Sequence, residues 1–378
     1  MNGSRGVAAS AQLTRRHAVG LLLGAAAAVP ALAPARAVTP PAASPVARDD
    51  LIGLPSQLVT DGELTLLDIA RQRSLGVPEI SAANPGVDPW VPGKETLLTL
   101  PTQHVLPDGP REGIVINKAE LRLYFFPKVG PVQTYAIGVG REGLNTPVGR
   151  TTVVRKAVRP TWRPTPETRL ARPELPAVVP PGPDNPLGEF ALYLGWPTYA
   201  VHGTHKPYGV GRRVSRGCIR MYPEGVARLY PQVPVGTRVT VVDQPVKVGW
   251  HAGELYLEVQ PDLAQIDELE ATYAMTPMPA PDARPLILAK AGADFTRVDW
   301  SVVDAELLSR RGIPVQITRP GGGQLVAADQ GGAATTGEMF ELTEPAEAAI
   351  PAVAAAPPAP ARLGSVEPAT PPATSGIY

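Results

Sequence analysis

The stretch His202–Met221 reads HGTHKPYGVGRRVSRGCIRM and holds Cys218, the only cysteine of the chain. A single thiol cannot form an internal disulfide, so Cys218 is either a buried small apolar residue or a nucleophile. Gly217, just before it, lets the backbone approach a substrate closely. Three neighbours are too polar for an inert core strand and favour the nucleophile: Ser215, Arg216 and Arg220. Nearby arginines are also expected to favour the thiolate, which is the reactive form.

A thiol nucleophile needs a base, and His202 is the best placed candidate. Of the five histidines, His17 lies in a segment that we expect to be removed. Four others remain: His104, His202, His205 and His251. His202 precedes Cys218 and ends an apolar run over 199–201 that predicts a strand. A strand, a glycine-rich loop and a return segment would bring the imidazole to the sulfur, the general arrangement for thiol acyl transfer.

The pattern H-G-x(n)-S-x-G-C-I-R resembles the signature of the L,D-transpeptidases with a YkuD-type catalytic domain. The similarity extends over about 113–243, through GIVINKAELRLYFF, YAIGVG, TPVG, PTWRPTP, LPAVVPPGPDNPLG and VGTRVTVV. It is most like the Gram-negative periplasmic members. The resemblance implies a mainly β (α+β) fold with a β-sandwich-like catalytic domain over 111–243. The alternating apolar residues of 113–127 and the segment that follows, 132–140, are together expected to form an antiparallel pair at the edge of that domain.

The resemblance also implies roles for individual residues. Cys218 would attack a donor tetrapeptide stem of peptidoglycan and expel D-alanine, while His202 takes the thiol proton. The backbone N–H groups of Gly217 and Cys218 would hold the oxyanion. Four residues would bind substrate: Arg220, Ser215, Arg216 and Gly203. Arg220 is the best candidate for a stem carboxylate, because a guanidinium pairs with one in a fork geometry; the competing interpretation is a structural salt bridge.

The acceptor stays open. It would be a diaminopimelate amine, giving 3-3 cross-links, or a lysine amine of an outer-membrane lipoprotein or β-barrel protein. No cofactor is implied, and carbapenems are expected to acylate Cys218. Two positions depart from the family: Arg216 stands where many members have a second histidine, and Gly203 where some have a serine. The group that orients His202 is therefore a backbone carbonyl or an unassigned residue, and His205 is either that helper or a surface loop residue.

Three alternatives stay in view. The first is a thiol hydrolase of the same peptidoglycan linkages, with water in place of the amine. The second is another cell-wall thiol enzyme, although papain-like endopeptidases place cysteine before histidine and sortases space the two more widely. The third is a non-catalytic peptidoglycan-binding scaffold. A metal site is not expected, because one cysteine and the pair His202 and His205 are too few ligands for zinc.

The length and charge of the chain limit how many domains it can form and which partners it is expected to bind. The 378 residues suffice for two or three small domains. Equal numbers of acidic and basic residues, 35 of each, give no electrostatic reason to expect nucleic acid or a polybasic membrane contact. Of the 46 prolines and 37 glycines, many lie in the two ends. The tail over 319–378 is rich in alanine and proline and is expected to be disordered.

The N-terminus predicts an export signal over 1–37. Arg15 and Arg16 precede the apolar stretch Ala18–Leu32, and small residues at 35–37 suit cleavage. The two arginines fit a twin-arginine signal or an ordinary Sec signal. The mature chain is therefore expected in the periplasm without a membrane span. Residues 38–57 are predicted to be a proline-rich linker.

A small unit over 58–101 resembles a LysM module, with a predicted βααβ order and Thr65 as a candidate helix cap. LysM modules bind the glycan of peptidoglycan or chitin; the alternative is a structural cap that binds no sugar. The insert over 160–188 is proline-rich, and the resemblance implies that it covers the donor site. Residues 244–318 are predicted to be an accessory segment against the catalytic domain, with helices near 262–274 and 298–310.

Overall fold

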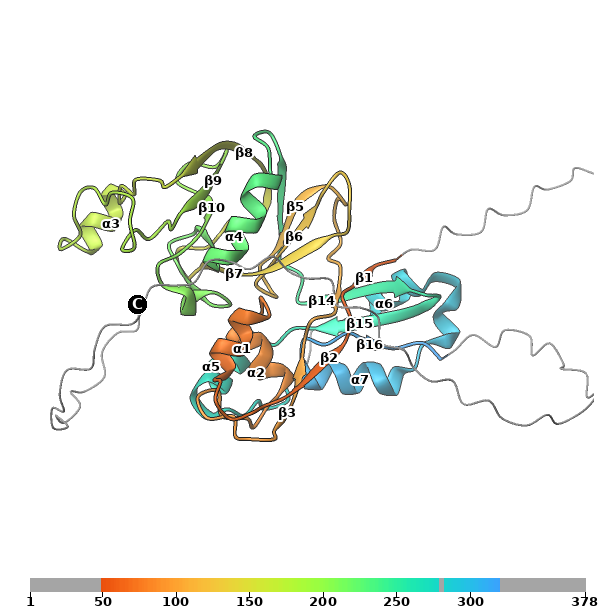
Figure 1. The fold of residues 1–378 in the computed structure, drawn as a ribbon. Helices are drawn as coiled ribbons and strands as arrows, with labels where there is room; N and C mark the ends of the chain where they lie inside the picture. Colours follow the sequence, from red (N-terminus) through yellow and green to blue (C-terminus); the bar gives the residue numbers. More distant parts are fainter. Residues whose placement is uncertain (1–48, 279–281, 320–378) are drawn as a thin grey trace, which may run out of the picture. The chain divides into compact units, whose positions relative to one another are not determined.

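The computed structural model describes residues 49–278 and 282–319, all within one compact unit (Figure 1). The predicted export signal and the predicted tail beyond Arg319 lie outside the described residues. Among the described helices, none is long and apolar enough to cross a bilayer.

The catalytic region is a nine-stranded sheet that closes on itself. Closure depends on β7, which pairs with β6 through its first half and with β12 and β11 through its second half. The prediction of a β-rich α+β domain is confirmed, but the strands form one closed sheet around the core rather than two separate layers. The strands are β5 (Gly113–Asn117), β6 (Arg122–Phe126), β7 (Gln133–Gly140), β8 (Gly149–Val158), β9 (Phe190–Leu194), β10 (Ala200–His202), β11 (Arg213–Ser215), β12 (Ile219–Met221) and β13 (Arg238–Val242).

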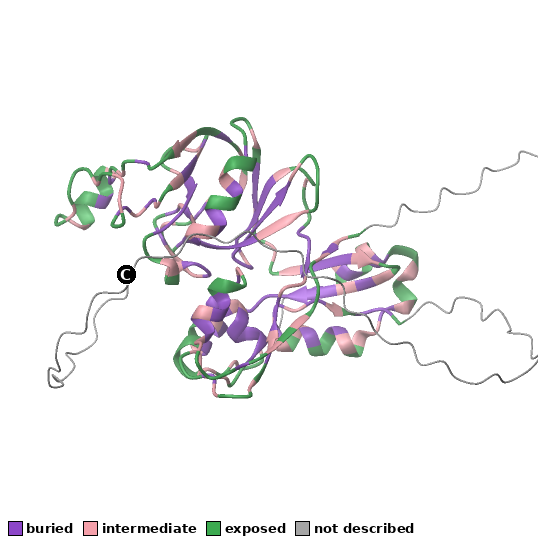
Figure 2. Cartoon of the chain, viewed as in Figure 1, coloured by how far each residue is buried: buried purple, intermediate pink, exposed green. Residues whose placement is uncertain are grey.

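The predicted antiparallel pairing of 113–127 with 132–140 is made by β6 and β7, but 113–127 forms two strands, β5 and β6, and the pair does not lie at an edge. β13 adds in parallel to β5, and β7 pairs with β6. Both faces of β6 are buried: Leu123 and Phe125 enter the main core, whereas Tyr124 and Phe126 enter a second cluster with Leu106. Figure 2 shows these strands as buried ribbon. Helix α4 (Pro223–Leu229) contributes Val226 and Leu229 to the main core.

The N-terminal unit has the predicted βααβ order. It consists of β2 (Ser56–Val59), α1 (Leu66–Gln72), α2 (Val77–Ala83) and β3 (Leu97–Leu100), with β2 and β3 antiparallel. Thr65 caps α1 as predicted, since its hydroxyl accepts the N–H of Asp68 at 3.1 Å. Asn84 ties the end of α2 to β3, because its side chain donates to the Thr99 carbonyl oxygen and accepts the Thr99 N–H.

The insert over 160–188 is fastened at its base. Its helix α3 (Pro166–Ala171) begins after Thr165, and Trp162 forms an isolated bridge with Val179. Asn185 is 1% exposed and donates to three backbone carbonyls of the insert. These contacts hold the loop together without a further strand of the sheet.

The C-terminal segment packs on the N-terminal unit as well as on the catalytic domain. Its strands β14 (Val246–His251), β15 (Glu254–Val259) and β16 (Val315–Gln316) form a small sheet, and a short pair, β1 (Leu51–Ile52) and β4 (His104–Val105), lies beside it. The two predicted helices are α5 (Leu263–Thr272) and α7 (Trp300–Ser309); α6 (Arg284–Ala291) was not predicted. Helix α5 packs against α2. Short 3-10 helices lie at Pro207–Gly209, Tyr230–Gln232 and Gly292–Arg297.

Candidate active site

His202 ends strand β10 inside the closed sheet. β10 pairs in parallel with β12, which sets His202 opposite Arg220, and antiparallel with β9, which sets it opposite Ala191. The side chain is buried, with 4% exposed. The sequence order of strand, glycine-rich loop and return segment therefore corresponds to β10, the loop over 203–212, β11 and β12.

The His202 imidazole has a defined tautomer. Its Nδ1 lies 2.5 Å from the Gly203 carbonyl oxygen, and because a carbonyl can only accept, Nδ1 carries the proton. Nε2 is then the unprotonated nitrogen. Burial, with a smaller contribution from Arg220, lowers the pKa of His202 to about 4 against the opposing effect of the Gly203 bond. The imidazole is therefore neutral at neutral pH, the form that a general base requires.

Cys218 follows a turn that requires glycine at position 217. Gly217 has φ of +111°, a conformation that side chains disfavour. A Cβ on it would lie 2.7 Å from the ring of Tyr199. That ring is itself held by an edge contact with Trp196 at a centroid distance of 6.1 Å. The turn and the aromatic pair together place the sulfur.

The Cys218 thiol is protonated at rest. It is half-buried and donates to the Thr198 carbonyl oxygen at 3.3 Å. Burial raises the pKa of the thiol, although the Ala200 N–H and the Arg220 charge oppose this. The arginine effect predicted from the sequence has the expected sign for Arg220, but burial outweighs it. The resting pair is a thiol and a neutral imidazole.

Two buried hydroxyls brace the turn. The Thr146 hydroxyl donates to the Gly217 carbonyl oxygen at 2.8 Å and accepts the Gly140 N–H at 3.1 Å. The Ser215 hydroxyl donates to the Cys218 carbonyl oxygen at 2.6 Å and accepts the Gly217 N–H at 3.1 Å. Both side chains are at most 1% exposed. The backbone on either side of the sulfur is thus fixed by two side chains, Ser215 from β11 and Thr146 from the loop between β7 and β8.

These contacts change three of the predicted roles. The Gly217 N–H is already bonded to Ser215, so it does not suit an oxyanion and leaves the Cys218 N–H as the candidate donor. Ser215 is buried and supports the turn, so a substrate contact does not fit its geometry. Gly203 is also buried and orients His202 through its carbonyl. From the sequence, the group that orients His202 was either a backbone carbonyl or an unassigned residue; in the structure it is the Gly203 carbonyl.

The remaining predicted residues lie at the surface of the site. Arg216 is exposed. It helps to lower the pKa of Glu167 in the insert, after larger contributions from that residue's own N–H and the Thr165 hydroxyl. His205 is exposed in the loop and makes no described contact with His202, so the surface interpretation fits it.

Arg220 lies beside the imidazole with its charge unbalanced. It faces His202 across the β10–β12 ladder. Within residues 49–278 and 282–319, no carboxylate lies within ion-pair distance of its guanidinium, in contrast to Arg212, which pairs with Glu270 at 2.7 Å. Burial lowers the pKa of Arg220. A half-buried cation without an acidic partner favours the substrate-carboxylate interpretation over the structural salt bridge.

A second titratable cluster lies away from the site. His104, Glu120 and Glu258 are buried, and their ligand atoms lie within 4.8 Å of one another, a spacing that suits a metal ion. The Lys247 ammonium pairs with Glu258 at 2.9 Å and also with Glu120. A cation therefore already occupies the position between the two carboxylates. This cluster could not be predicted from the sequence, because charged residues are ordinarily expected at the surface.

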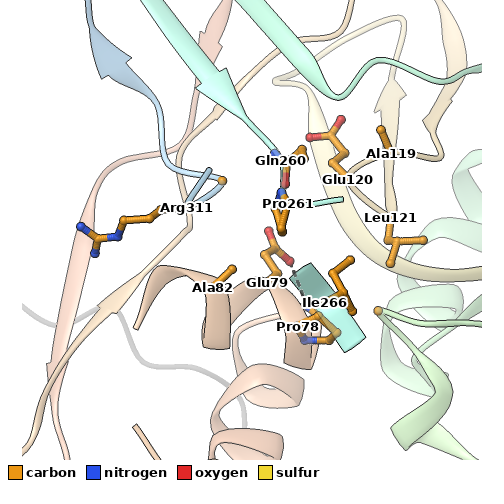
Figure 3. Close-up of a pocket in the computed structure, with 13 residues that line it drawn as sticks. Pro78, Glu79, Ala82, Ala119, Glu120, Leu121, Gln260, Pro261, Ile266 and Arg311 are labelled. Carbon is orange, nitrogen blue, oxygen red and sulfur yellow. Dashed lines mark hydrogen bonds between the residues drawn. The ribbon is translucent and has the colours of Figure 1, made fainter. Parts of the chain in front are cut away.

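Beside this cluster is a cavity of about 20 Å³, which suffices for one water molecule. Figure 3 shows its lining, with Glu79 from α2, Glu120 from the turn before β6 and Gln260 after β15. Glu79 accepts the Gly76 N–H at 2.8 Å and pairs with buried Arg122 at 2.8 Å. The N-terminal unit, the catalytic domain and the C-terminal segment thus contact one another through buried charged side chains.

The resting protonation states predict a pH profile. Alkylation of Cys218 by iodoacetamide should be slow at neutral pH and rise through the alkaline range, because burial raises the thiol pKa. Loss of the base should set in only near pH 4, where His202 becomes protonated. The pKa of His202 is lower in the folded chain than the unfolded value of 6.5. Between pH 6.5 and 4 the unfolded chain therefore binds this proton and the folded chain does not, so the free energy of unfolding decreases as the pH falls through this range. An alkylation rate already saturated at pH 7 would contradict the profile.

The Thr146 brace gives a second prediction. Thr146→Val keeps the shape but leaves the Gly217 carbonyl and the Gly140 N–H without a partner. We expect acylation of Cys218 to slow by about tenfold, corresponding to roughly 1.4 kcal/mol. Thr237→Val is the control, because that hydroxyl donates to Pro234 outside the site. Equal rates of Cys218 acylation in the two variants would show that Thr146 does not support the turn.

Comparisons with known proteins identify the family of the chain. Residues 111–241 match the L,D-transpeptidase catalytic domain, YkuD. The chain is 43% identical to the probable L,D-transpeptidase YbiS of Escherichia coli over 258 residues, covering 66% of this chain and 81% of the relative. It is 39% identical to the probable L,D-transpeptidase YcfS of the same organism over 309 residues, covering 78% of this chain and 92% of the relative. On this extent of similarity, the chain belongs to the L,D-transpeptidase family of peptidoglycan enzymes.

Proposed function

We propose that Cys218 and His202 catalyse L,D-transpeptidation through a thioester. The observation that carries this is the tautomer of His202: Nδ1 is held by Gly203, so Nε2 is the free base beside the strand that follows Cys218. His202 takes the thiol proton as sulfur attacks the carbonyl after the third residue of a donor tetrapeptide. The proton passes to the leaving amine, and D-alanine departs. The Cys218 N–H stabilises the oxyanion.

In the second step an amine attacks the thioester, giving a 3-3 cross-link or an anchored outer-membrane protein. Arg220 binds a carboxylate of the substrate, and its unbalanced charge supports this role. The chain is exported to the periplasm by its signal at 1–37, and its βααβ unit acts as a LysM-like module on the glycan. The exposed Trp90 in the loop before β3 supports sugar contact, since 60% of it is open to solvent.

The test is a muropeptide profile of the chain from residue 38 onward, incubated with sacculi that contain tetrapeptides, next to Cys218→Ala. New 3-3 dimers and released D-alanine, both lost in Cys218→Ala, are the expected result. Release of D-alanine without dimers, even after outer-membrane proteins are added, would indicate the hydrolase. No change with either protein would favour the non-catalytic scaffold.

A further inference from the structure

The turn over 73–76, which joins helices α1 and α2 of the N-terminal unit, is inserted into the catalytic domain. The Ser74 carbonyl oxygen accepts the Ala136 N–H of β7 at 3.3 Å. The next carbonyl oxygen, that of Leu75, accepts the hydroxyl of buried Tyr222 at 3.0 Å. The N-terminal unit thus supplies backbone acceptors for two donors of the catalytic domain.

The Ala136 N–H lies where the closed sheet changes partners. Ala136 is in register with Arg122 of β6. The next residue, Ile137, is in register with Met221 of β12. A buried N–H between two partner strands needs an acceptor from elsewhere, and Ser74 provides it. Ser74 itself has φ of +56°, a conformation at which a helix end usually carries glycine, and such strain persists where surrounding contacts hold it.

Gly76 packs backbone against backbone on the loop that connects His202 to the strands around Cys218. A Cβ on Gly76 would lie 2.9 Å from the Cα of Gly211, and a Cβ on Gly211 would lie 2.5 Å from the Cα of Gly76. Gly76 has φ of −78°, which any residue adopts. Glycine is therefore required at this position by the close approach of the two segments and not by its own conformation.

The contact continues from the turn to the groups around the reacting pair. Val210, in the same loop, forms a buried cluster with Ala136 and Tyr222. Tyr222 directly follows β12, the strand that carries Arg220. A Cβ on Gly209 would lie 3.5 Å from a terminal nitrogen of Arg220, so the loop also contacts the guanidinium. A displacement of the turn would therefore move both the loop and β12.

We propose that the turn over 73–76 is a positioning element of the active site. Its contacts at Gly76 and Gly211, and at Tyr222, hold the loop over 203–212 and strand β12, so that the catalytic pair keeps its geometry. The proposal rests on the proposed function, and it makes these three residues positioning residues for that reaction. The N-terminal unit then acts on catalysis through its fold, independently of any glycan that it binds.

The first test measures hydrogen exchange in the chain from residue 38 onward, so that it is independent of catalysis. Gly76→Ala should raise the exchange rate of peptides over 203–212 and 133–140 by about tenfold, because the added Cβ separates the turn from the loop. Gly249→Ala is the matched control. Its Cβ would lie 2.6 Å from the Cβ of Asp50, so it introduces a clash in the C-terminal segment and should leave both peptides unchanged.

The second test measures the rate constant of Cys218 acylation by a saturating tetrapeptide donor, together with the fraction finally acylated, by intact mass. Gly76→Ala should lower the rate constant about tenfold while the whole sample is still acylated. A purely structural defect would instead lower the fraction and leave the rate constant normal. Tyr222→Phe removes only the hydroxyl that bonds to Leu75 and should lower the rate constant about threefold, which keeps the proposal testable if Gly76→Ala does not fold.

Two results would overturn the positioning role. One is a rate constant in Gly76→Ala and Tyr222→Phe equal to that of Gly249→Ala, even if hydrogen exchange rises. The other is unchanged exchange over 203–212 in Gly76→Ala, because the turn would then not hold the loop. Failure of the unmodified chain to form a thioester would instead overturn the catalytic proposal, while the exchange result still decides whether the turn holds the loop.

Discussion

Gly217→Ala is expected to lower the rate of Cys218 acylation by at least about a hundredfold, because a small displacement of a nucleophile costs a factor of this order. The added Cβ would lie 2.7 Å from the Tyr199 ring, and φ of +111° is unfavourable for alanine. The turn must then move, and the sulfur moves with it. Intact mass during incubation with a carbapenem or with tetrapeptide donor measures the rate.

The control is Gly236→Ala, at φ of +90° with no atom within 4 Å of the added Cβ. It carries the backbone strain without the clash and should acylate at the normal rate. Adding Tyr199→Ala to Gly217→Ala removes the clash and should recover part of the rate. If Gly217→Ala and Gly236→Ala acylate equally fast, the turn does not position the sulfur.

Lys247→Met is expected to lower the free energy of unfolding by about 3–5 kcal/mol. The substitution leaves two carboxylates, Glu120 and Glu258, buried without their cation. Burial raises the pKa of Glu258, and Lys247 is the main opposing influence. Urea denaturation of the chain from residue 38 onward, followed by circular dichroism, measures the loss.

Lys290→Met serves as the comparison, because Lys290 pairs with Asp108, whose side chain is 51% exposed. Such a pair contributes about 0–1 kcal/mol. Changing Glu120 and Glu258 to glutamine in the Lys247→Met background should restore part of the stability by removing the unpaired charge. A loss no larger than that of Lys290→Met would show that the cluster is not a stabilising element.

The order of strand, loop and return segment around His202 and Cys218 could be predicted from the sequence, because both residues stand in one short stretch. The brace from Thr146 could not, because that residue reaches the turn from 71 positions away. The sequence predicts the Gly217 N–H as an oxyanion donor, because it does not show that the Ser215 hydroxyl accepts this N–H.

Local elements were also easier to predict than their neighbours in space. The cap at Thr65 and helices α5 and α7 follow from short-range patterns. The position of β5 and β6 inside the sheet does not, since it depends on β13, which lies more than a hundred residues further along the chain. The buried charges of Lys247 and Glu258 likewise resemble surface residues until their partners are known.

The position of β13 has a consequence for how the chain matures. It is the last strand of the closed sheet in the chain, yet it inserts between β5 and β8, pairing with both. Until residues 238–242 are available, those two strands present unpaired edges, which are prone to pair with other chains. The sheet that carries His202 therefore cannot close until the last strand of the catalytic domain has been added.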